Sequence, residues 1–310
     1  MILVTGATGF VGRALVPRLV EGGATVRCLI RPSKHSPRLP KEIPLQVAIA
    51  PITDFRGVRA AMVGVDTVIH LASAEWRGAR GSLQKVDVDG TRKMIEAAKE
   101  AGVGRLIYLS HVGADKSSAY DVHRTKGYVE DLIRRSEIPH TIFRSTLLYG
   151  EEDSFANCIA MALATVPSVF LMPANGKMLV QPLWVEDLVT CIEWSLDDLT
   201  TINQTLTLGG PEFITFEQMT RIIMEATRLT RTFVPVGIPY LRWGAAFLER
   251  FLPRSPITTR WLDHLAVNRI TELVSVTRYF GLKPARFEQT INYMAERDWS
   301  AEMRKYVWGR

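Results

Sequence analysis

Short runs of apolar, β-branched residues alternate with helical repeats through the first half of the chain. Strands are predicted at residues 2–5, 25–30, 45–50, 67–71, 106–110 and 140–144. Helical stretches over 90–101 and 126–136 are long enough for right-handed crossover connections between such strands. This alternation is typical of a parallel sheet with helices on both faces.

The alternation of strand and helix patterns becomes less regular after Gly150. The elements expected there are helices over 155–165, 185–196 and 216–229 and a strand over 204–208. Thr215 and Gln218 predict a capping box at the start of the third of these helices. We therefore expect a doubly wound α/β (Rossmann) domain over residues 1–150 and a smaller, mainly helical C-terminal lobe over residues 151–310. The strand over 204–208 is expected to return to the main sheet.

Three aromatic residues recur at helical spacing late in the chain, namely Trp243, Phe247 and Phe251. Such a repeat predicts packing into a protein core. The segment around them carries Arg242, Glu249 and Arg250. It falls short of the roughly 20 continuous apolar residues that a spanning helix needs. The sequence therefore predicts an amphipathic helix packed on protein and no transmembrane segment.

Composition and charge limit the kinds of partner that the protein is expected to bind. The 310 residues are 47% hydrophobic, which is enough to fill a core, and the net charge is +6. The basic residues are scattered among 32 acidic ones, so we expect no nucleic-acid binding and a weaker attraction for anionic ligands. The histidines and cysteines lack metal-ligand spacing, and no metal is expected. The three cysteines predict buried, reduced thiols, and Met1 directly before the first strand predicts a cytoplasmic protein.

Residues 5–12 read TGATGFVG and lie between the first predicted strand and a helix. Gly6 permits the tight turn, Gly9 a close backbone approach to a pyrophosphate, and Gly12 close packing of helix on sheet. A helix N-terminus that follows such a turn attracts phosphate. The alternative is a tight turn without a ligand. The residues expected to contact a dinucleotide are Gly6, Ala7, Thr8, Gly9, Phe10, Val11 and Gly12.

The end of the second strand decides between the two nicotinamide cofactors. An acidic residue there would bind the ribose 2′-hydroxyl of NAD(H), whereas an arginine suits the 2′-phosphate of NADP(H). The sequence has no acid at this point and offers Arg31 and Lys34 instead. We expect NADP(H) to be preferred over NAD(H). The alternative is that both residues are ordinary solvated loop charges.

Further strings extend the pattern. These are VDTVIHLAS at 65–73, VDGTRKMIEAAKEAGVGRLIYLS ending at Ser110, HRTKGYVED around Lys126, TIFRSTLLYG ending at Gly150, and QPLWVEDL at 181–188. With them the chain resembles the short-chain dehydrogenase/reductase superfamily. Within it, the chain is similar to an atypical, epimerase/dehydratase-like group that includes the NADPH-binding accessory subunit of respiratory complex I. The resemblance implies further cofactor contacts from Ile52, Leu71, Ala72, Ser73, Ser110, Lys126, Ser145 and Thr146.

In this superfamily a Ser, a Tyr and a Lys four residues after the Tyr carry out hydride chemistry. Ser110 and Lys126 match by position, but Val122 occupies the tyrosine position. Tyr120 lies two residues earlier, about 200° away from the required side if the helix already includes it. It serves as the acid/base only if the helix begins after it and the loop folds Tyr120 back toward the cofactor. The catalytic residues expected from the resemblance are therefore Ser110, Lys126 and a displaced Tyr120.

Two functions remain open at this stage. The first is an NADP(H)-dependent oxidoreductase or epimerase-like enzyme acting on an unidentified small molecule. The second is a non-catalytic, NADPH-binding accessory or assembly protein peripheral to a membrane complex. The retained glycine loop, Ser110 and Lys126 favour the enzyme, whereas Val122 favours the accessory protein.

Overall fold

The structure is a computed structural model that describes residues 1–33, 39–40, 43–252 and 254–308. The chain forms two compact units. The first comprises residues 1–75, 81–145 and 185–208, and the second comprises 76–80, 146–184 and 209–310. These units differ from a division at residue 150, because residues 185–208 return to the first unit with a helix and a strand.

The first unit contains a seven-stranded sheet in which all neighbouring strands run parallel. Across the sheet the order is β11-β6-β5-β4-β1-β2-β3. The strands span Ile2–Thr5 (β1), Val26–Ile30 (β2), Gln46–Ile49 (β3), Thr67–His70 (β4), Arg105–His111 (β5), His140–Ser145 (β6) and Gln204–Leu208 (β11). The central strands are almost entirely buried, as their continuous apolar runs require.

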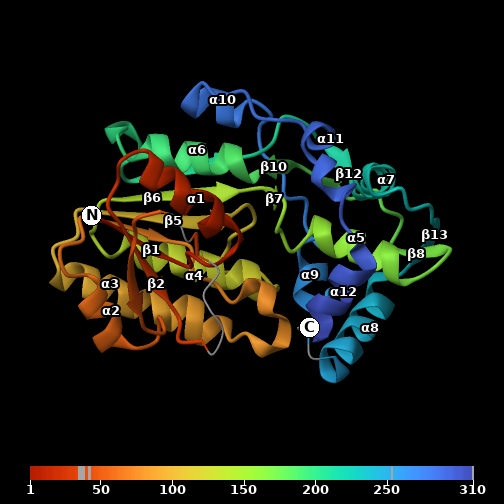
Figure 1. Ribbon diagram of the computed structural model, residues 1–310, viewed down its shortest axis with the longest axis horizontal. Helices are drawn as coiled ribbons and strands as arrows, with labels where there is room; N and C mark the ends of the chain where they lie inside the picture. The colour runs from red at the N-terminus through yellow and green to blue at the C-terminus, as the bar shows by residue number, and fades with distance from the viewer. Residues whose placement is uncertain (34–38, 41–42, 253, 309–310) are drawn as a thin grey trace. The chain divides into compact units, whose positions relative to one another are not determined.

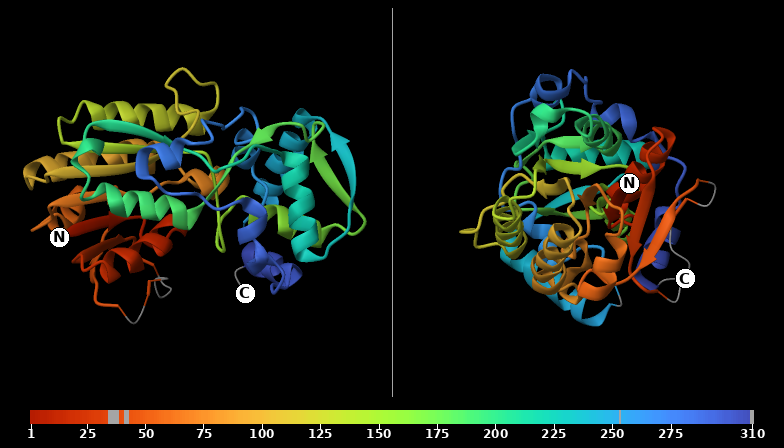
Figure 2. Two further views of the ribbon diagram at one scale, coloured as in Figure 1. Left: turned by 90° about the horizontal axis from the view of Figure 1, so that it is seen from above. Right: turned by 90° about the vertical axis from the view of Figure 1, so that its left-hand side faces the viewer.

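Helices cover both faces of this sheet (Figure 1). They are α1 (Phe10–Glu21), α2 (Phe55–Ala61), α3 (Gly90–Glu100), α4 (Asp121–Arg134) and α6 (Val185–Ser195). Helix α1 contacts α6 on one face, while α2, α3 and α4 follow one another on the other face. Figure 2 shows the same layers from two other directions. The predicted doubly wound α/β fold is confirmed.

Strand order places a potential binding site in the first unit. From β1 the chain moves outward to β2 and β3, then returns to β4 on the other side of β1. The order therefore reverses between β1 and β4. In open parallel sheets, ligands collect beyond the carboxyl ends of the strands at such a switch point.

The second unit is mainly helical, with three small strand pairs. Its strands are β7 (Leu147–Tyr149), β8 (Val169–Pro173), β9 (Leu179–Val180), β10 (Pro182–Trp184), β12 (Ile214–Thr215) and β13 (Thr232–Val236). Its helices are α5 (Ala156–Thr165), α7 (Phe216–Thr227), α8 (Ile238–Phe251), α9 (Thr259–Asp263), α10 (Ser275–Phe280), α11 (Phe287–Thr290) and α12 (Trp299–Trp308). The expected capping box is confirmed at the start of α7.

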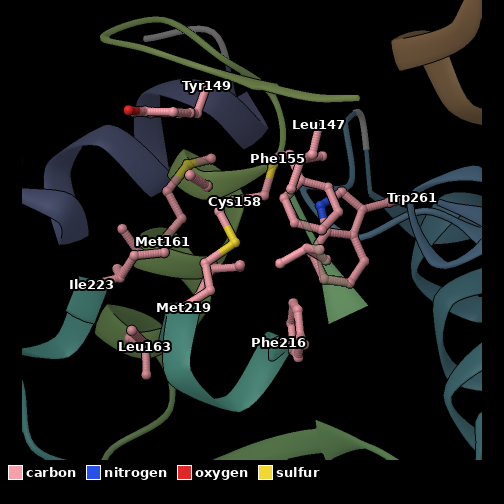
Figure 3. Close-up of a cluster of buried hydrophobic side chains, with 14 of the residues drawn as sticks. Leu147, Tyr149, Phe155, Cys158, Met161, Leu163, Phe216, Met219, Ile223 and Trp261 are labelled. Atoms are coloured by element: carbon pink, nitrogen blue, oxygen red, sulfur yellow. The ribbon is translucent and has the colours of Figure 1, made fainter. Parts of the chain in front are cut away.

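Aromatic side chains form a large part of the hydrophobic core of the second unit (Figure 3). Phe155 stacks on Trp261 with ring centroids 4.8 Å apart, and Phe216 meets both rings edge-on. Cys158 lies among them, and all three cysteines of the chain are free and buried, as expected. Offset and edge-on aromatic contacts stabilise by about 0.5–1.5 kcal/mol per pair beyond the area they bury.

Helix α8 contradicts one prediction. Trp243, Phe247 and Phe251, expected in a core, are 76%, 53% and 68% exposed. The helix instead packs on the unit through Ala245 and the half-buried Leu241, on another side. The helical spacing of the aromatic residues correctly predicted that one side of α8 is apolar. It did not show that this side stays uncovered by the described part of the chain. Among the described residues, no helix combines the length and apolarity needed to cross a membrane.

Candidate functional site

The turn after β1 is built on glycine for steric reasons. Gly6 has φ +74°, and a Cβ there would lie 2.7 Å from the backbone of both Leu71 and Ala72 at the end of β4. Gly9 N donates to Gly6 O at 2.8 Å and closes the turn. A Cβ on Gly12 would lie 2.5 Å from the same oxygen. The three glycines therefore allow two strands and a helix to meet at one corner.

The start of α1 presents open backbone donors at this corner. Gly9 is the N-cap residue and makes no side-chain capping bond, so the first N–H groups of the helix lack that partner. Thr8 and Gly9 are exposed, Phe10 is half-buried, and Ala7 and Val11 are buried in the fold. Backbone amides without a side-chain cap at a helix N-terminus, beside the exposed residues Thr8 and Gly9, fit a diphosphate.

The end of β4 forms one wall of the corner. Leu71 N and Ala72 N donate to Thr5 O and Thr5 Oγ1, at 3.1 and 3.3 Å. The Ser73 hydroxyl instead donates to buried Asp87 at 2.6 Å. Leu71, Ala72 and Ser73 thus follow β4 beside the corner, and the Ser73 hydroxyl is already bonded to a carboxylate.

His70 has a structural place beside this wall. Its two ring nitrogens contact Thr5 Oγ1 at 2.7 Å and Thr91 Oγ1 at 2.8 Å. Burial, together with the nearby charge of Lys126, lowers the pKa of His70 to about 3. The ring is therefore neutral and joins β1 to α3.

Lys126 lies at the centre of a buried charged cluster. Its Nζ donates to Leu109 O at 3.3 Å, lies 3.8 Å from a Glu75 carboxylate oxygen, and sits 5.2 Å from the centre of the Tyr108 ring. Burial opposes its charge, but Tyr108, Glu75 and Asp87 outweigh burial and hold the pKa of Lys126 above its ordinary value. The lysine is thus a fixed cation in a low-dielectric place.

The pKa values of two acidic groups near Lys126, Asp87 and Tyr108, are raised as well. Burial raises the pKa of Asp87 despite the nearby Lys126 and the hydrogen bonds from Ser73 and Ala74 N. Burial also raises the pKa of the Tyr108 hydroxyl. Groups whose pKa values are displaced together in one crevice are typical of functional sites, although structural ion pairs produce the same effect.

Ser110 points into a different network. Its hydroxyl donates to Glu130 at 2.6 Å, and that carboxylate also accepts from Arg144 at 2.6 and 2.9 Å and from Arg134 at 2.8 Å. Burial would raise the pKa of Glu130, but the hydrogen bonds from Arg144, Ser110 and Arg134 lower it below its ordinary value. The structure therefore brings Ser110 to Glu130 rather than to Lys126.

Helix α4 begins at Asp121, five residues before the predicted start, and Tyr120 is its N-cap residue. The helix thus begins after Tyr120, as an acid/base role requires. The Tyr120 ring lies edge-on to His123, with centroids 6.0 Å apart, and no hydrogen bond joins it to Lys126 among the described residues. Val122 is buried with Ala74 and Leu83 in a small apolar cluster.

The other residues expected to contact the cofactor lie in several different parts of the chain. Arg31 is exposed directly after β2, and Lys34 lies outside the described residues. Ile52 packs against Gly90 at the start of α3. The Ser145 hydroxyl donates to Ser110 O at 3.3 Å. Thr146, in the second unit, has a buried hydroxyl without a hydrogen-bond partner among the described residues.

Sequence reasoning missed Glu75, Asp87, Tyr108 and Glu130. A signal for two of them was available. Tyr108 and Ser110 are two residues apart on β5, so they share one side of the sheet, and Lys126 and Glu130 are four apart on α4, so they share one side of the helix. Glu75 and Asp87 reach the site only through tertiary folding, and no local pattern points to them.

A doubly wound parallel sheet with a glycine corner at its switch point defines a dinucleotide-binding class of protein. Comparison with known families gives the same result, because residues 6–162 match the family model described as NAD(P)H-binding. The chain belongs to this NAD(P)H-binding family.

Relatives extend the match along the chain. It is 30% identical over 274 residues to mitochondrial NADH dehydrogenase (ubiquinone) 1 alpha subcomplex subunit 9 of Rattus norvegicus, covering 86% of this chain and 70% of that protein. The subunit of the same name in Arabidopsis thaliana is 29% identical over 249 residues. That match covers 78% of this chain and only 62% of the Arabidopsis protein.

Solved structures share the fold at low identity. An NADPH-dependent quinone oxidoreductase from Escherichia coli, complexed with NADPH, superposes with a TM-score of 0.75 at 16% identity and covers 95% of this chain and 99% of its own. A UDP-glucose 4-epimerase from Thermus thermophilus, in complex with NAD, gives 0.71 at 18% identity and covers 99% of both chains. The fold is therefore epimerase- and reductase-like.

Proposed function

We propose that this chain binds NADP(H) and works as an atypical short-chain reductase or epimerase-like enzyme on a small molecule. The observation that carries the proposal is the uncapped start of α1 beside Gly6, where a Cβ would strike the end of β4. Because the N-cap residue Gly9 has no side chain, the first N–H groups of α1 stay without a side-chain partner, and such groups bind phosphate.

The proposed contacts follow from position. Backbone amides over Gly6–Gly12 bind the diphosphate. Arg31 and Lys34 attract the 2′-phosphate, which is the basis for preferring NADP(H) over NAD(H). Ile52 borders the adenine, Leu71, Ala72 and Ser73 lie beneath the cofactor, and Ser145 and Thr146 border the nicotinamide end.

Bound NADP(H) supplies or accepts the hydride in this class of reaction. The chain itself has to hold the nicotinamide ribose and handle a proton. Lys126, whose pKa is held above its ordinary value by Tyr108, Glu75 and Asp87, is suited to the first task. For the second, Tyr120 is the expected group, and Glu75 is the carboxyl side chain that the structure places 3.8 Å from Lys126 Nζ. Ser110, bonded to Glu130, is proposed to hold β5 against α4 rather than to touch substrate.

One observation favours a second candidate, a non-catalytic NADPH-binding accessory protein. Val122 fills the tyrosine position and is buried in an apolar cluster, where it can neither give nor take a proton. General acid/base catalysis contributes about 100- to 10,000-fold, so a chain without it is a weak enzyme. The relatives named as NADH dehydrogenase subunits fit this reading, including association at the periphery of a membrane complex.

Two assays separate the candidates: consumption of NADPH with a panel of quinones, aldehydes and ketones, and epimerisation of nucleotide sugars followed by chromatography, since epimerisation leaves the cofactor unchanged. For the enzyme we expect turnover of at least one compound and a loss of about 100-fold or more in Lys126→Met. Lys116→Met is the matched control, because Lys116 is an exposed lysine of the same unit paired with Asp131. Saturable NADPH binding without turnover of any compound supports the accessory protein. Equal turnover in Lys126→Met contradicts the proposed role of that lysine.

A further inference from the structure

Helix α8 carries a continuous line of exposed rings, here called the aromatic stripe: Tyr240, Trp243, Phe247 and Phe251. At 100° per residue these four side chains fall within about 80° of one another around the helix. Trp243 stacks on Phe247 with ring centroids 6.2 Å apart and Phe247 contacts Phe251 at 4.5 Å, so these three rings form one surface, and the exposed Tyr240 lies on the same side of the helix. Figure 1 shows α8 at the outer edge of the second unit. Contiguous exposed apolar surface of this kind marks an interaction site.

The charged side chains of α8 and of the residues just after it differ in where they point. Glu249 is the one acidic residue in the sequence 239–260, and it faces the protein, accepting from Thr259 N and Thr259 Oγ1 at 3.2 and 3.0 Å. Arg242 is paired with Asp263. Arg250 and Arg254 are exposed. The outward charges of this segment are therefore positive and come from Arg250 and Arg254.

We propose that the aromatic stripe seats this chain on the surface of a bilayer that contains anionic lipids. Tyr240 and Trp243 have an apolar body and a polar edge, which favours the headgroup level of a membrane, and Phe247 and Phe251 add purely apolar surface. The 14 residues of α8 make a helix about 21 Å long, which is too short to span but suited to lying in the interface. Arg250 and Arg254 complement lipid phosphates, as basic residues do on interfacial helices.

A second copy of the chain fits the stripe less well. A two-fold contact brings the same surface of both copies together, so each copy would present Arg250 and Arg254 to the other. The outward side of α8 offers no carboxylate to pair with them, since Glu249 is turned to Thr259. Like charges brought together in this way oppose association. Anionic lipid satisfies both the rings and the arginines.

Co-sedimentation of the full chain with vesicles tests the proposal. We expect binding to vesicles of phosphatidylcholine mixed with phosphatidylglycerol, and weaker binding to phosphatidylcholine alone or at high salt. The triple variant Trp243→Ser, Phe247→Ser, Phe251→Ser should bind the mixed vesicles at least about tenfold more weakly. Because these side chains are exposed, its thermal unfolding should stay close to that of the unmodified chain.

Matched variants separate the stripe from general surface properties. Ile49→Ser with Val63→Ser removes two apolar side chains of the first unit that are each 68% exposed, and it should bind like the unmodified chain. Arg250→Gln with Arg254→Gln should lose the preference for anionic lipid, whereas Arg59→Gln with Arg135→Gln removes two exposed charges elsewhere and should keep it.

Three results would overturn the proposal. The first is an unmodified chain that stays in solution with anionic vesicles. The second is a triple variant that sediments as the unmodified chain does. The third is a vesicle-independent dimer, seen by light scattering, that the triple variant abolishes, since the stripe would then bind a second copy.

Discussion

Replacing Gly6 by alanine is expected to weaken both the fold and nucleotide binding. Gly6 has φ +74°, and the left-handed region costs an L-residue about 1–2 kcal/mol. The new Cβ would also lie 2.7 Å from backbone atoms of Leu71 and Ala72, and forcing a packed backbone apart costs about 1–3 kcal/mol more. We therefore expect the free energy of unfolding to fall by about 2–5 kcal/mol. Affinity for NADPH should fall at least about tenfold, because the diphosphate corner is displaced.

Gly23→Ala is the matched control. Gly23 also has a positive φ, +84°, but an added Cβ would meet nothing within 4 Å. Gly23→Ala should lose only the cost of the left-handed backbone, about 1–2 kcal/mol, and keep full nucleotide affinity. Denaturant unfolding and a fluorescence titration of both variants make the comparison. Equal losses in Gly6→Ala and Gly23→Ala would show that the corner is not a close meeting of two strands.

Glu130→Gln is the second change with a large expected effect. The Glu130 side chain is fully buried and accepts from Ser110, Arg134 and Arg144. Breaking a buried ion pair destabilises by about 3–5 kcal/mol, and partial exposure of both arginines reduces this to about 2–3 kcal/mol. Glu217→Gln is the control, because the Glu217–Arg221 pair on α7 is exposed and its loss should change stability by at most about 0.5 kcal/mol.

The pH dependence of the Glu130 effect has a definite sign. The hydrogen bonds lower the pKa of Glu130 in the folded chain below that of the unfolded chain. Its contribution is therefore fully present above the unfolded value and is lost as pH falls through the folded one. Urea unfolding should show a constant gap between the unmodified chain and Glu130→Gln from neutral pH down to about 5, and a shrinking gap below the ordinary Glu pKa of about 4.3. A gap that widens on acidification would contradict the assigned network.

Elements whose signal is local could be predicted from the sequence. The strand runs at residues 2–5 and 204–208 match β1 and β11 to the residue, because apolar runs bounded by turns leave little choice. The glycine corner was also readable, since the spacing of Gly6, Gly9 and Gly12 follows from backbone geometry. Helix α4 began earlier than predicted because its N-cap residue, Tyr120, makes no capping bond that a sequence pattern could reveal.

Contacts made through space could not be predicted. Glu75 and Asp87 surround Lys126 only after β4, β5 and α4 have assembled, so nothing in the sequence near residue 126 indicates a buried acidic cluster. The exposed side of helix α8 could not be predicted from the sequence either. A repeat of rings at helical spacing identifies one apolar side, but burial depends on what the rest of the chain places there, and here Trp243 stays exposed.

The central claim is that backbone amides between β1 and α1 receive the diphosphate of a nicotinamide dinucleotide. Titration of the purified full chain with NADPH and with NADH, followed by fluorescence, tests it most directly. We predict saturable binding, with NADPH bound more tightly because Arg31 stands where an acid would select NADH. Tighter binding of NADH would overturn the role of Arg31, and no saturable binding of either nucleotide would contradict the claim itself.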